Sequence, residues 1–289
     1  MSENDRGPVV VSGTSTGIGA ATALYLAEKG FRVFAGVRRP ADGEALETRA
    51  SGELTPLLLE ITDEASIAAA VDAVERAVGA RGLAGLVNNA GIVVPGPLEF
   101  QPLADFRKQL EVNLVGQLAV TQAFLPLIRR GHGRIVNVGS IGGRLVLPMH
   151  GAYSASKFGM EALSDALRLE LRQWRIPVSL VDPGATESAI FGKTLAAIDD
   201  VKAALDGNGQ AQYDGQLDAI RRTVEKTAAD AAPAKVLAKA IGDALMSDKP
   251  RTRYLAGHGA KEAAALARTT TDHIKDRAIA REVGLPAPE

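Results

Sequence analysis

The segment YSASK (153–157) carries two side chains that can exchange protons with a bound molecule. Tyr153 and Lys157 are four residues apart, and residues with this spacing share one face of a helix. A neighbouring ammonium favours the phenolate form, so we expect Lys157 to lower the pKa of Tyr153 from its ordinary value of about 10. Such a phenol suits general acid–base catalysis near neutral pH. The pair alone is also compatible with an exposed pair that has no function.

A second candidate motif is the glycine-rich segment SGTSTGIGA (12–20). Gly13, Gly17 and Gly19 have the spacing Gly-x-x-x-Gly-x-Gly, which permits a tight turn and a close approach of a ligand to the backbone. Free amide groups at the start of a helix bind diphosphate. The spacing differs from Gly-x-Gly-x-x-Gly and lacks the Gly-Lys-Ser/Thr of nucleotide-triphosphate loops. Its position after a first strand favours dinucleotide binding over a plain tight connection.

The segment AGVRRP (35–40) bears on which dinucleotide is bound. An acidic residue at the end of the second strand typically holds the ribose of NAD, whereas an arginine accommodates the 2′-phosphate of NADP. Val37 stands at the acidic position, and Arg38 and Arg39 follow it. A guanidinium group suits a phosphate. We therefore expect NADP(H), with NAD(H) as the alternative; the other interpretation is that these arginines are solvated, above all Arg39.

The elements that must position these motifs alternate between short apolar runs and amphipathic runs. This βαβ alternation predicts an α/β fold with a parallel sheet covered by helices on both faces. Strands are predicted at 8–13, 31–36, 55–60, 83–91, 133–140, 176–184 and 251–257. Helices are predicted at 17–29, 40–50, 63–78, 102–130, 151–174 and 233–247, with helical stretches at 186–230 that are broken at 206–210, and a helical tail at 259–283.

Composition excludes several classes of protein and site. The 289-residue chain has a net charge of −1 and no cysteine, which excludes disulfides and thiolate chemistry and does not favour nucleic-acid binding. Its four histidines are scattered, so we expect no metal site. The polar N-terminus does not resemble a secretory signal, and no uninterrupted apolar run approaches the length of a membrane span. We expect a cytoplasmic protein.

Four motifs together resemble those of the short-chain dehydrogenase/reductase family: YSASK, SGTSTGIG, NNAG (88–91) and DPGATES (182–188). They occur in the order and at the spacings of that family, and the resemblance covers about residues 8–258. It implies a single doubly wound Rossmann-type domain with a parallel seven-stranded sheet over residues 1–289. Residues 8–184 would form the core, 185–231 a helical substrate lid after the sixth strand, and 232–289 the last helix, strand and tail.

The resemblance also implies a cofactor site. Glycines 13, 17 and 19 would form the turn, with Ser15 and Ile18 beside the diphosphate. Glu60 is a departure, because the family often has aspartate there in contact with adenine; Asp63 is expected to cap the following helix instead. The full set of cofactor residues that the resemblance and the arginine argument predict is Gly13, Ser15, Gly17, Ile18, Gly19, Arg38, Glu60, Ile61, Asn89, Ala90, Gly91, Tyr153, Lys157, Pro183, Gly184 and Thr186.

For the catalytic set the resemblance implies Asn113, Ser140, Tyr153 and Lys157. Tyr153 would exchange the proton and Ser140 would hydrogen-bond the substrate oxygen. Lys157 would tune Tyr153 and bind the nicotinamide ribose, and Asn113 would hold a water of the proton relay. Taken singly, Ser140 could end a strand, Asn113 could pin a helix and Tyr153 could be a core aromatic. The function implied is alcohol/carbonyl oxidoreduction; a non-catalytic NADPH-binding sensor or scaffold is the alternative.

The substrate site is expected beyond the carboxyl ends of the strands. Residues 141–150 and 186–230 leave those ends, and they supply the candidate pocket residues Leu145, Met149, His150 and Phe191. An apolar pocket suits a hydrophobic alcohol or ketone, although the same residues could only pack a lid. The pattern KPRTRYLAG (249–257) resembles the hydroxysteroid- and retinol-type branch. Members of the short-chain dehydrogenase/reductase family commonly pair the helices equivalent to 102–130 and 151–174 between subunits, so we expect a homodimer or homotetramer. The alternative is that these helices only pack on the sheet of their own chain.

Overall fold

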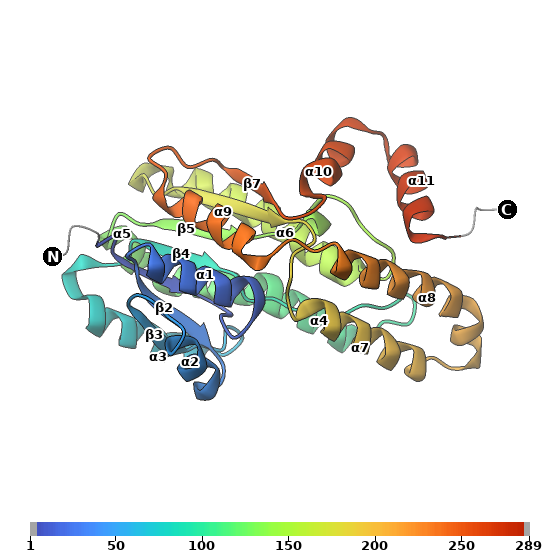
Figure 1. Ribbon diagram of the computed structural model, residues 1–289, viewed down its shortest axis with the longest axis horizontal. Helices are drawn as coiled ribbons and strands as arrows, with labels where there is room; N and C mark the ends of the chain where they lie inside the picture. The colour runs from blue at the N-terminus through green and yellow to red at the C-terminus, as the bar shows by residue number, and fades with distance from the viewer. Residues whose placement is uncertain (1–4, 286–289) are drawn as a thin grey trace.

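The central element of the computed structural model, which describes residues 5–285, is a parallel sheet of seven strands (Figure 1). The strand order is β3-β2-β1-β4-β5-β6-β7, and every neighbouring pair is parallel. This confirms the predicted seven-stranded doubly wound sheet. The strands are β1 Pro8–Val11, β2 Arg32–Val37, β3 Leu54–Leu58, β4 Gly85–Asn88, β5 Arg134–Val138, β6 Val178–Pro183 and β7 Arg253–Ala256.

Helices cover both faces of this sheet, which explains why the central strands are apolar throughout rather than alternating. Helices α1, α2 and α9 enclose one apolar cluster with the sheet, and α3, α5 and α6 enclose the other. The helices are α1 Gly17–Glu28, α2 Pro40–Glu47, α3 Glu64–Val78, α4 Leu103–Leu110, α5 Gly116–Arg130, α6 Gly151–Glu170, α7 Ile190–Ala204, α8 Gly207–Ala229, α9 Ala234–Met246, α10 Ala260–Thr269 and α11 Asp272–Val283.

The strand order reverses between β1 and β4, and this reversal fixes where a ligand can enter. The chain leaves β1 toward β2 and β3 on one side, and leaves β4 toward β5 and β6 on the other. The connections therefore diverge at the carboxyl ends of these two strands, and a crevice opens between them. The glycine turn after β1 and the NNAG segment after β4 both lie at this point.

The predicted helix at 102–130 is two α-helices joined by a π-helical turn, Glu111–Val115, that carries Asn113. The Gly116 amide donates to the Glu111 carbonyl, a five-residue separation that marks the wider turn. Taken together as one helix, Leu103–Arg130 is long and apolar enough to cross a membrane, by length and composition alone. No other helix within residues 5–285 meets this criterion. Its central side chains Val120, Phe124 and Ile128 are buried in the core between α3 and the sheet.

Beyond the carboxyl ends of the strands, α7 and α8 form a projecting helical hairpin (Figure 1). The break between them lies at Leu205–Asp206, at the start of the predicted interruption, and the Asp206 carboxylate caps α8 by accepting from the Gly209 amide. The hairpin has its own apolar cluster, separate from the two cores of the sheet. The tail, predicted as helical, is split into α10 and α11, and Val283 of α11 is buried in that same cluster.

Candidate active site

A cavity of about 1510 Å³ lies at the carboxyl ends of β1, β4, β5 and β6. Its walls are built from the glycine turn, the ends of β2 and β3, helix α4 and the hairpin of α7 and α8. The four predicted catalytic residues line it. All of the predicted cofactor residues line it as well: Gly13, Ser15, Gly17, Ile18, Gly19, Arg38, Glu60, Ile61, Asn89, Ala90, Gly91, Tyr153, Lys157, Pro183, Gly184 and Thr186. The structure therefore gathers into one site residues that are far apart in the sequence.

The glycine turn has a backbone that only glycine adopts without strain. Gly13 and Gly17 have positive φ values of 69° and 58°. A Cβ atom at Gly13 would lie 2.6 Å from the Cα atom of Ala90, and one at Gly19 would collide with the Gly13 carbonyl. Thr16 precedes α1 without capping it through its side chain, so the first-turn amides are free for an anion. These features fit a dinucleotide diphosphate.

Asn89 ties the two halves of the crevice together. Its Nδ2 donates to the carbonyls of Ser12 and Gly13, both at 3.0 Å, while the Ser12 hydroxyl accepts from the amides of Asn89 and Ala90. These bonds hold the end of β4 against the turn after β1. Asn89 therefore supports the shape of the glycine turn, in addition to lining the cavity.

Arg38 lies on the rim of the cavity, directly after β2. Its side chain is 70% exposed and its nearest acidic partner is Glu60, at 3.9 Å, so the guanidinium is free to meet an anion. Arg39 instead forms an ion pair with Asp42 at 2.7 Å. Glu60 faces the same part of the cavity and accepts from the amide and the hydroxyl of Thr62. Asp63 caps α3, as the sequence predicts.

Asn113 is held rigidly by the π-helical turn. Its Oδ1 accepts from the Ile92 amide at 2.9 Å, and its Nδ2 donates to the Ile92 carbonyl at 3.0 Å and to the Ser156 hydroxyl at 3.2 Å. One turn earlier, Gln109 accepts from the Val94 amide and donates to the Ile92 carbonyl. The two amide side chains fix the loop after β4 against the helix. Gln109 has no counterpart among the predicted site residues, although its spacing of four from Asn113 indicates a shared face.

Ser140, Tyr153 and Lys157 meet where β5 ends and α6 begins. The Ser140 hydroxyl accepts from the Gly142 amide at 3.0 Å and lies near the Tyr153 phenol. The Lys157 amine lies 5.9 Å from the centre of the Tyr153 ring and donates to the Val138 carbonyl at 2.9 Å. Both side chains project from α6 into a buried part of the cavity.

The pKa of Tyr153 in this structure is opposite in direction to the expectation from the YSASK pattern. Burial raises the pKa of Tyr153, and the nearby Ser140 hydroxyl only partly opposes this effect. Burial also lowers the pKa of Lys157 to about 8. The expected lowering of the Tyr153 pKa by Lys157 was wrong for this structure because the sequence spacing does not reveal how deeply both groups are buried.

The family model for short chain dehydrogenases matches residues 8–199, which include YSASK, SGTSTGIG, NNAG and DPGATES. The chain belongs to the short-chain dehydrogenase/reductase family. It is an oxidoreductase that interconverts alcohols and carbonyl compounds with a nicotinamide cofactor, as members of this family do.

Named relatives and a solved structure agree with this assignment. Human retinol dehydrogenase 5 is 38% identical over 263 residues, which cover 88% of this chain and 81% of that protein. Bovine (Bos taurus) 17-beta-hydroxysteroid dehydrogenase type 6 is 37% identical over 261 residues, with the same shares covered. The NADPH-dependent 3-dehydrocapnine reductase of Ornithobacterium rhinotracheale is 33% identical over 85% of this chain and 86% of that protein. A short-chain dehydrogenase structure from Streptomyces avermitilis superimposes with a TM-score of 0.77 at 27% identity, covering 98% of this chain and 97% of that one.

The predicted substrate residues of this short-chain dehydrogenase/reductase divide into two pairs. His150 and Phe191 line the cavity. Burial lowers the pKa of His150, whose Nδ1 lies 3.1 Å from the Pro148 carbonyl, so the ring is neutral at physiological pH. Met149 has a positive φ of 63°. Its side chain is buried in the apolar cluster of α7 and α8 and does not line the cavity. Leu145 is half-buried and is not part of the cavity wall.

The loop after β4 supplies cavity residues that the sequence did not single out. Val94, Pro97 and Phe100 line the side that faces α7. Tyr213 of α8 reaches this loop, with its ring at 5.7 Å from that of Phe100 and its hydroxyl donating to Glu99 at 2.7 Å. The loop leaves the carboxyl end of a central strand, and that position was the available signal.

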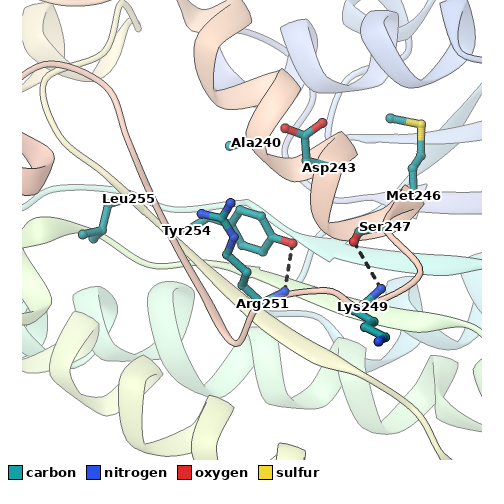
Figure 2. A pocket seen from close by; sticks show the side chains of 8 residues that line it. All are labelled: Ala240, Asp243, Met246, Ser247, Lys249, Arg251, Tyr254 and Leu255. Atoms are coloured by element: carbon teal, nitrogen blue, oxygen red, sulfur yellow. Dashed lines mark hydrogen bonds between the residues drawn. The ribbon is translucent and has the colours of Figure 1, made fainter.

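A second, smaller pocket of about 540 Å³ lies between the end of α9 and β7 (Figure 2). Its lining is polar and includes Asp243, Lys249 and Arg251, and the Arg251 amide donates to the Tyr254 hydroxyl at 3.0 Å. It shares no residue with the larger cavity. Within residues 5–285, no group of three or more histidine or carboxylate side chains is arranged to hold a metal ion.

Proposed function

We propose that this enzyme uses NADP(H) to interconvert a secondary alcohol and a ketone, or an aldehyde, on a hydrophobic small molecule. The observation that carries the proposal is one cavity with two chemically different ends. Arg38 and the free amides of α1 lie at one end, and Ser140, Tyr153 and Lys157 lie at the other. A dinucleotide cofactor has a group for each end, phosphates for the first and a nicotinamide ring for the second.

The preference for NADP(H) over NAD(H) rests on the end of β2. Strand β2 ends at Val37, which is buried and apolar. The strand therefore does not end in a carboxylate that could accept hydrogen bonds from a ribose 2′-hydroxyl. Arg38 extends over the cavity rim at that point. The printed name of one relative, the NADPH-dependent 3-dehydrocapnine reductase, agrees with this choice for that protein. An NAD-preferring dehydrogenase is the alternative.

In the proposed reaction the residues around Tyr153 move a proton. A bound nicotinamide supplies or accepts the hydride. The Tyr153 phenol donates its proton to the forming alkoxide in reduction and accepts it in oxidation. The Ser140 hydroxyl, oriented by the Gly142 amide, donates a hydrogen bond to the substrate oxygen and stabilises its growing charge. The Lys157 ammonium favours the tyrosinate that this exchange creates.

The proposed substrate is mainly apolar because several large apolar side chains line the cavity beyond Ser140. Phe100, Leu147, Phe191 and Val201 line that part of the cavity. Retinol and 17-beta-hydroxysteroid dehydrogenases are among the relatives by their printed names, which supports a lipid-like alcohol or ketone of the same general character. Neutral His150 adds one polar contact at the wall.

Reduction of carbonyl compounds by wild type and Tyr153→Phe tests the proposal. We expect wild type to oxidise NADPH in the presence of at least one apolar ketone or aldehyde from a panel of aryl, cyclic and long-chain compounds. Tyr153→Phe should bind NADPH with unchanged affinity but lose at least about 100-fold in kcat, because it lacks the exchangeable proton. Tight NADPH binding by both proteins without turnover would instead favour a non-catalytic sensor or scaffold.

We also propose that the enzyme is a cytoplasmic homodimer or homotetramer that pairs the helices at 102–130 and 151–174. Phe158, Leu169 and Trp174 project from α6 and the turn after it with exposed fractions of 45%, 63% and 42%. Val115, the last residue of the π-helical turn before α5, is exposed as well. A large apolar surface on neighbouring helices suits a subunit interface.

A further inference from the structure

A buried carboxylate lies directly behind the predicted catalytic residues. Asp182, at the end of β6, has no solvent exposure, and a Cβ atom at Gly139, directly after the neighbouring strand β5, would collide with its Oδ1. The absence of a side chain at Gly139 therefore gives the carboxylate its space. That Oδ1 accepts no hydrogen bond from the described residues. A carboxylate held this way needs a compensating charge.

Arg144 supplies the compensating charge. Its Nε and Nη2 donate to the Asp182 Oδ2 at 3.0 and 2.8 Å, and its Nη2 also lies 2.9 Å from Glu161. Arg253 of β7 donates to Glu161 and to Asp165 of α6. The chain of charges thus links the loop after β5, the end of β6, helix α6 and β7. Breaking a buried pair of this kind leaves an uncompensated charge and is costly.

This chain of charges contacts the segment that carries the reaction. The Val138 carbonyl accepts the hydrogen bond from Lys157, Gly139 contacts Asp182, and Ser140 follows directly. Arg144 belongs to the loop that starts at Ser140, and its amide is bonded to the Ile141 carbonyl. The Arg144–Asp182 pair therefore fastens this loop to β6.

We propose that Asp182, held by Arg144, is a positioning residue with two roles. It fixes the loop that carries Ser140, and it places a negative charge near the amine of Lys157. The proposal rests on the function proposed above. The charge of Asp182 favours the protonated forms of both Lys157 and Tyr153, and so opposes the effect of burial on the pKa of Lys157.

The charge on Asp182 itself depends on the groups that face it. Burial raises the pKa of Asp182, the Glu161 carboxylate of α6 raises it further, and Arg144 lowers it. The charge of Asp182 acts in turn on Lys157 and Tyr153 of α6, and Arg253 of β7 is paired with Glu161. Arg144 is accordingly the residue that keeps Asp182 ionised at neutral pH.

The decisive experiment follows Lys157 without requiring turnover. Protein labelled with ¹⁵N-lysine is titrated by NMR, and the side-chain resonance of Lys157 is assigned by its absence in Lys157→Met. In Asp182→Asn the titration midpoint should move to lower pH than in wild type, whereas Asp182→Glu, which keeps the charge, should restore it. Asp165→Asn, at the far end of the same network, is the matched control and should leave the midpoint unchanged. An identical midpoint in wild type and Asp182→Asn overturns the proposal.

Turnover gives a second readout that separates this inference from the proposed function. With a ketone that wild type reduces, Asp182→Asn should lower kcat about tenfold on the alkaline side while KM changes less than twofold, because proton transfer and not binding is affected. A wild type that binds NADPH and reduces nothing refutes the proposed function, and the NMR titration still decides the role of Asp182. If Asp182→Asn does not fold, Arg144→Gln tests the same contact and should move the Lys157 midpoint in the same direction; an unmoved midpoint overturns the proposal.

Discussion

At the scale of single residues, Arg38 tests the choice of cofactor. Removing its side chain with Arg38→Ala should raise the Kd for NADPH about 10–100-fold and leave the Kd for NADH nearly unchanged, since a hydrogen bond to a charged group is worth about 1.5–3 kcal/mol. Stability should hardly change, because the contact with Glu60 is long and exposed. Nicotinamide fluorescence titrations measure both constants. Arg39→Ala is the control, and an equal loss for both cofactors with Arg38→Ala would contradict the assignment.

Lys157 is expected to cost the protein stability. Its pKa in the folded protein is about 8, below the ordinary value of 10.5, so the protonated amine is penalised by burial at neutral pH. Between pH 8 and 10.5 the Lys157 amine is deprotonated in the folded protein but still protonated in the unfolded chain. The free energy of unfolding therefore rises over this range, and the penalty disappears. We therefore expect Lys157→Met to raise the free energy of unfolding at pH 7 by about 1–3 kcal/mol while abolishing turnover.

Denaturant unfolding at several pH values checks this prediction. The advantage of Lys157→Met should shrink steadily above pH 8. Lys239→Met removes an exposed lysine that is paired with Asp243, and it should change stability by less than about 0.5 kcal/mol at every pH. A variant at Lys157 that is less stable than wild type at neutral pH would show that the amine contributes more through its bond to Val138 than it loses through burial.

Sequence reasoning found the candidate residues but not their electrostatics. The spacing of Ser140, Tyr153 and Lys157 was enough to predict that they belong together, because family motifs and helix geometry both depend on spacing. Burial depends on the whole fold, so the raised pKa of Tyr153 had no local signal. Asp182 was visible only as part of a motif, since its partner Arg144 is 38 residues away.

At the scale of elements, the turn between β1 and α1 is highly sensitive to an added methyl group. Gly13→Ala should lower stability by more than about 1 kcal/mol and weaken NADPH binding, because Gly13 has a positive φ and its Cβ would lie 2.6 Å from Ala90. Gly215→Ala is the matched control: a Cβ there meets nothing within 4 Å, and alanine should stabilise α8 by about 0.5–1 kcal/mol. Thermal unfolding and NADPH titration of both variants decide; equal behaviour would contradict the prediction.

The helix at 102–130 shows where element prediction stops. Its apolar periodicity predicts one continuous helix, and the π-helical turn at Glu111–Val115 leaves no mark in that pattern. The turn exists because the amide side chains of Gln109 and Asn113 are both bonded to the loop after β4. Those partners come from a different segment, so no local sequence rule reveals the extra residue. Met149 is a similar case, because its positive φ redirects a side chain that the apolar pattern assigned to the pocket.

At the scale of the whole molecule, the sheet was the most predictable feature. Alternation of buried strands with amphipathic helices admits few arrangements, and right-handed parallel crossovers leave the doubly wound sheet as the natural one. The packing of the tail on the hairpin of α7 and α8 was not predictable. Val283 belongs to the apolar cluster of these helices although it follows them by more than fifty residues in the sequence.

The assembly of subunits is tested by placing charge on the exposed face of α6. We expect the double variant Phe158→Asp/Leu169→Asp to convert a dimer or tetramer into a folded monomer, because two carboxylates cannot be buried unpaired in an apolar interface. Size-exclusion chromatography with light scattering measures the mass. Ile274→Asp places the same charge on the exposed side of α11 and should leave the mass unchanged. A wild type that is already monomeric would refute the proposed interface.

The burial of Val283 against α7 and α8 affects the order in which the parts of the cavity can form while the chain is synthesised. The nascent chain can form the end of the crevice at the glycine turn once β1 to β5 have emerged from the ribosome, since the glycine turn, Asn89 and Asn113 all precede Arg134. The end of the crevice at Tyr153 and Pro183 is synthesised later. The hairpin of α7 and α8 must wait for the last helix to supply its missing apolar contact. The end of the crevice that meets the diphosphate can thus form well before the substrate compartment has its final walls.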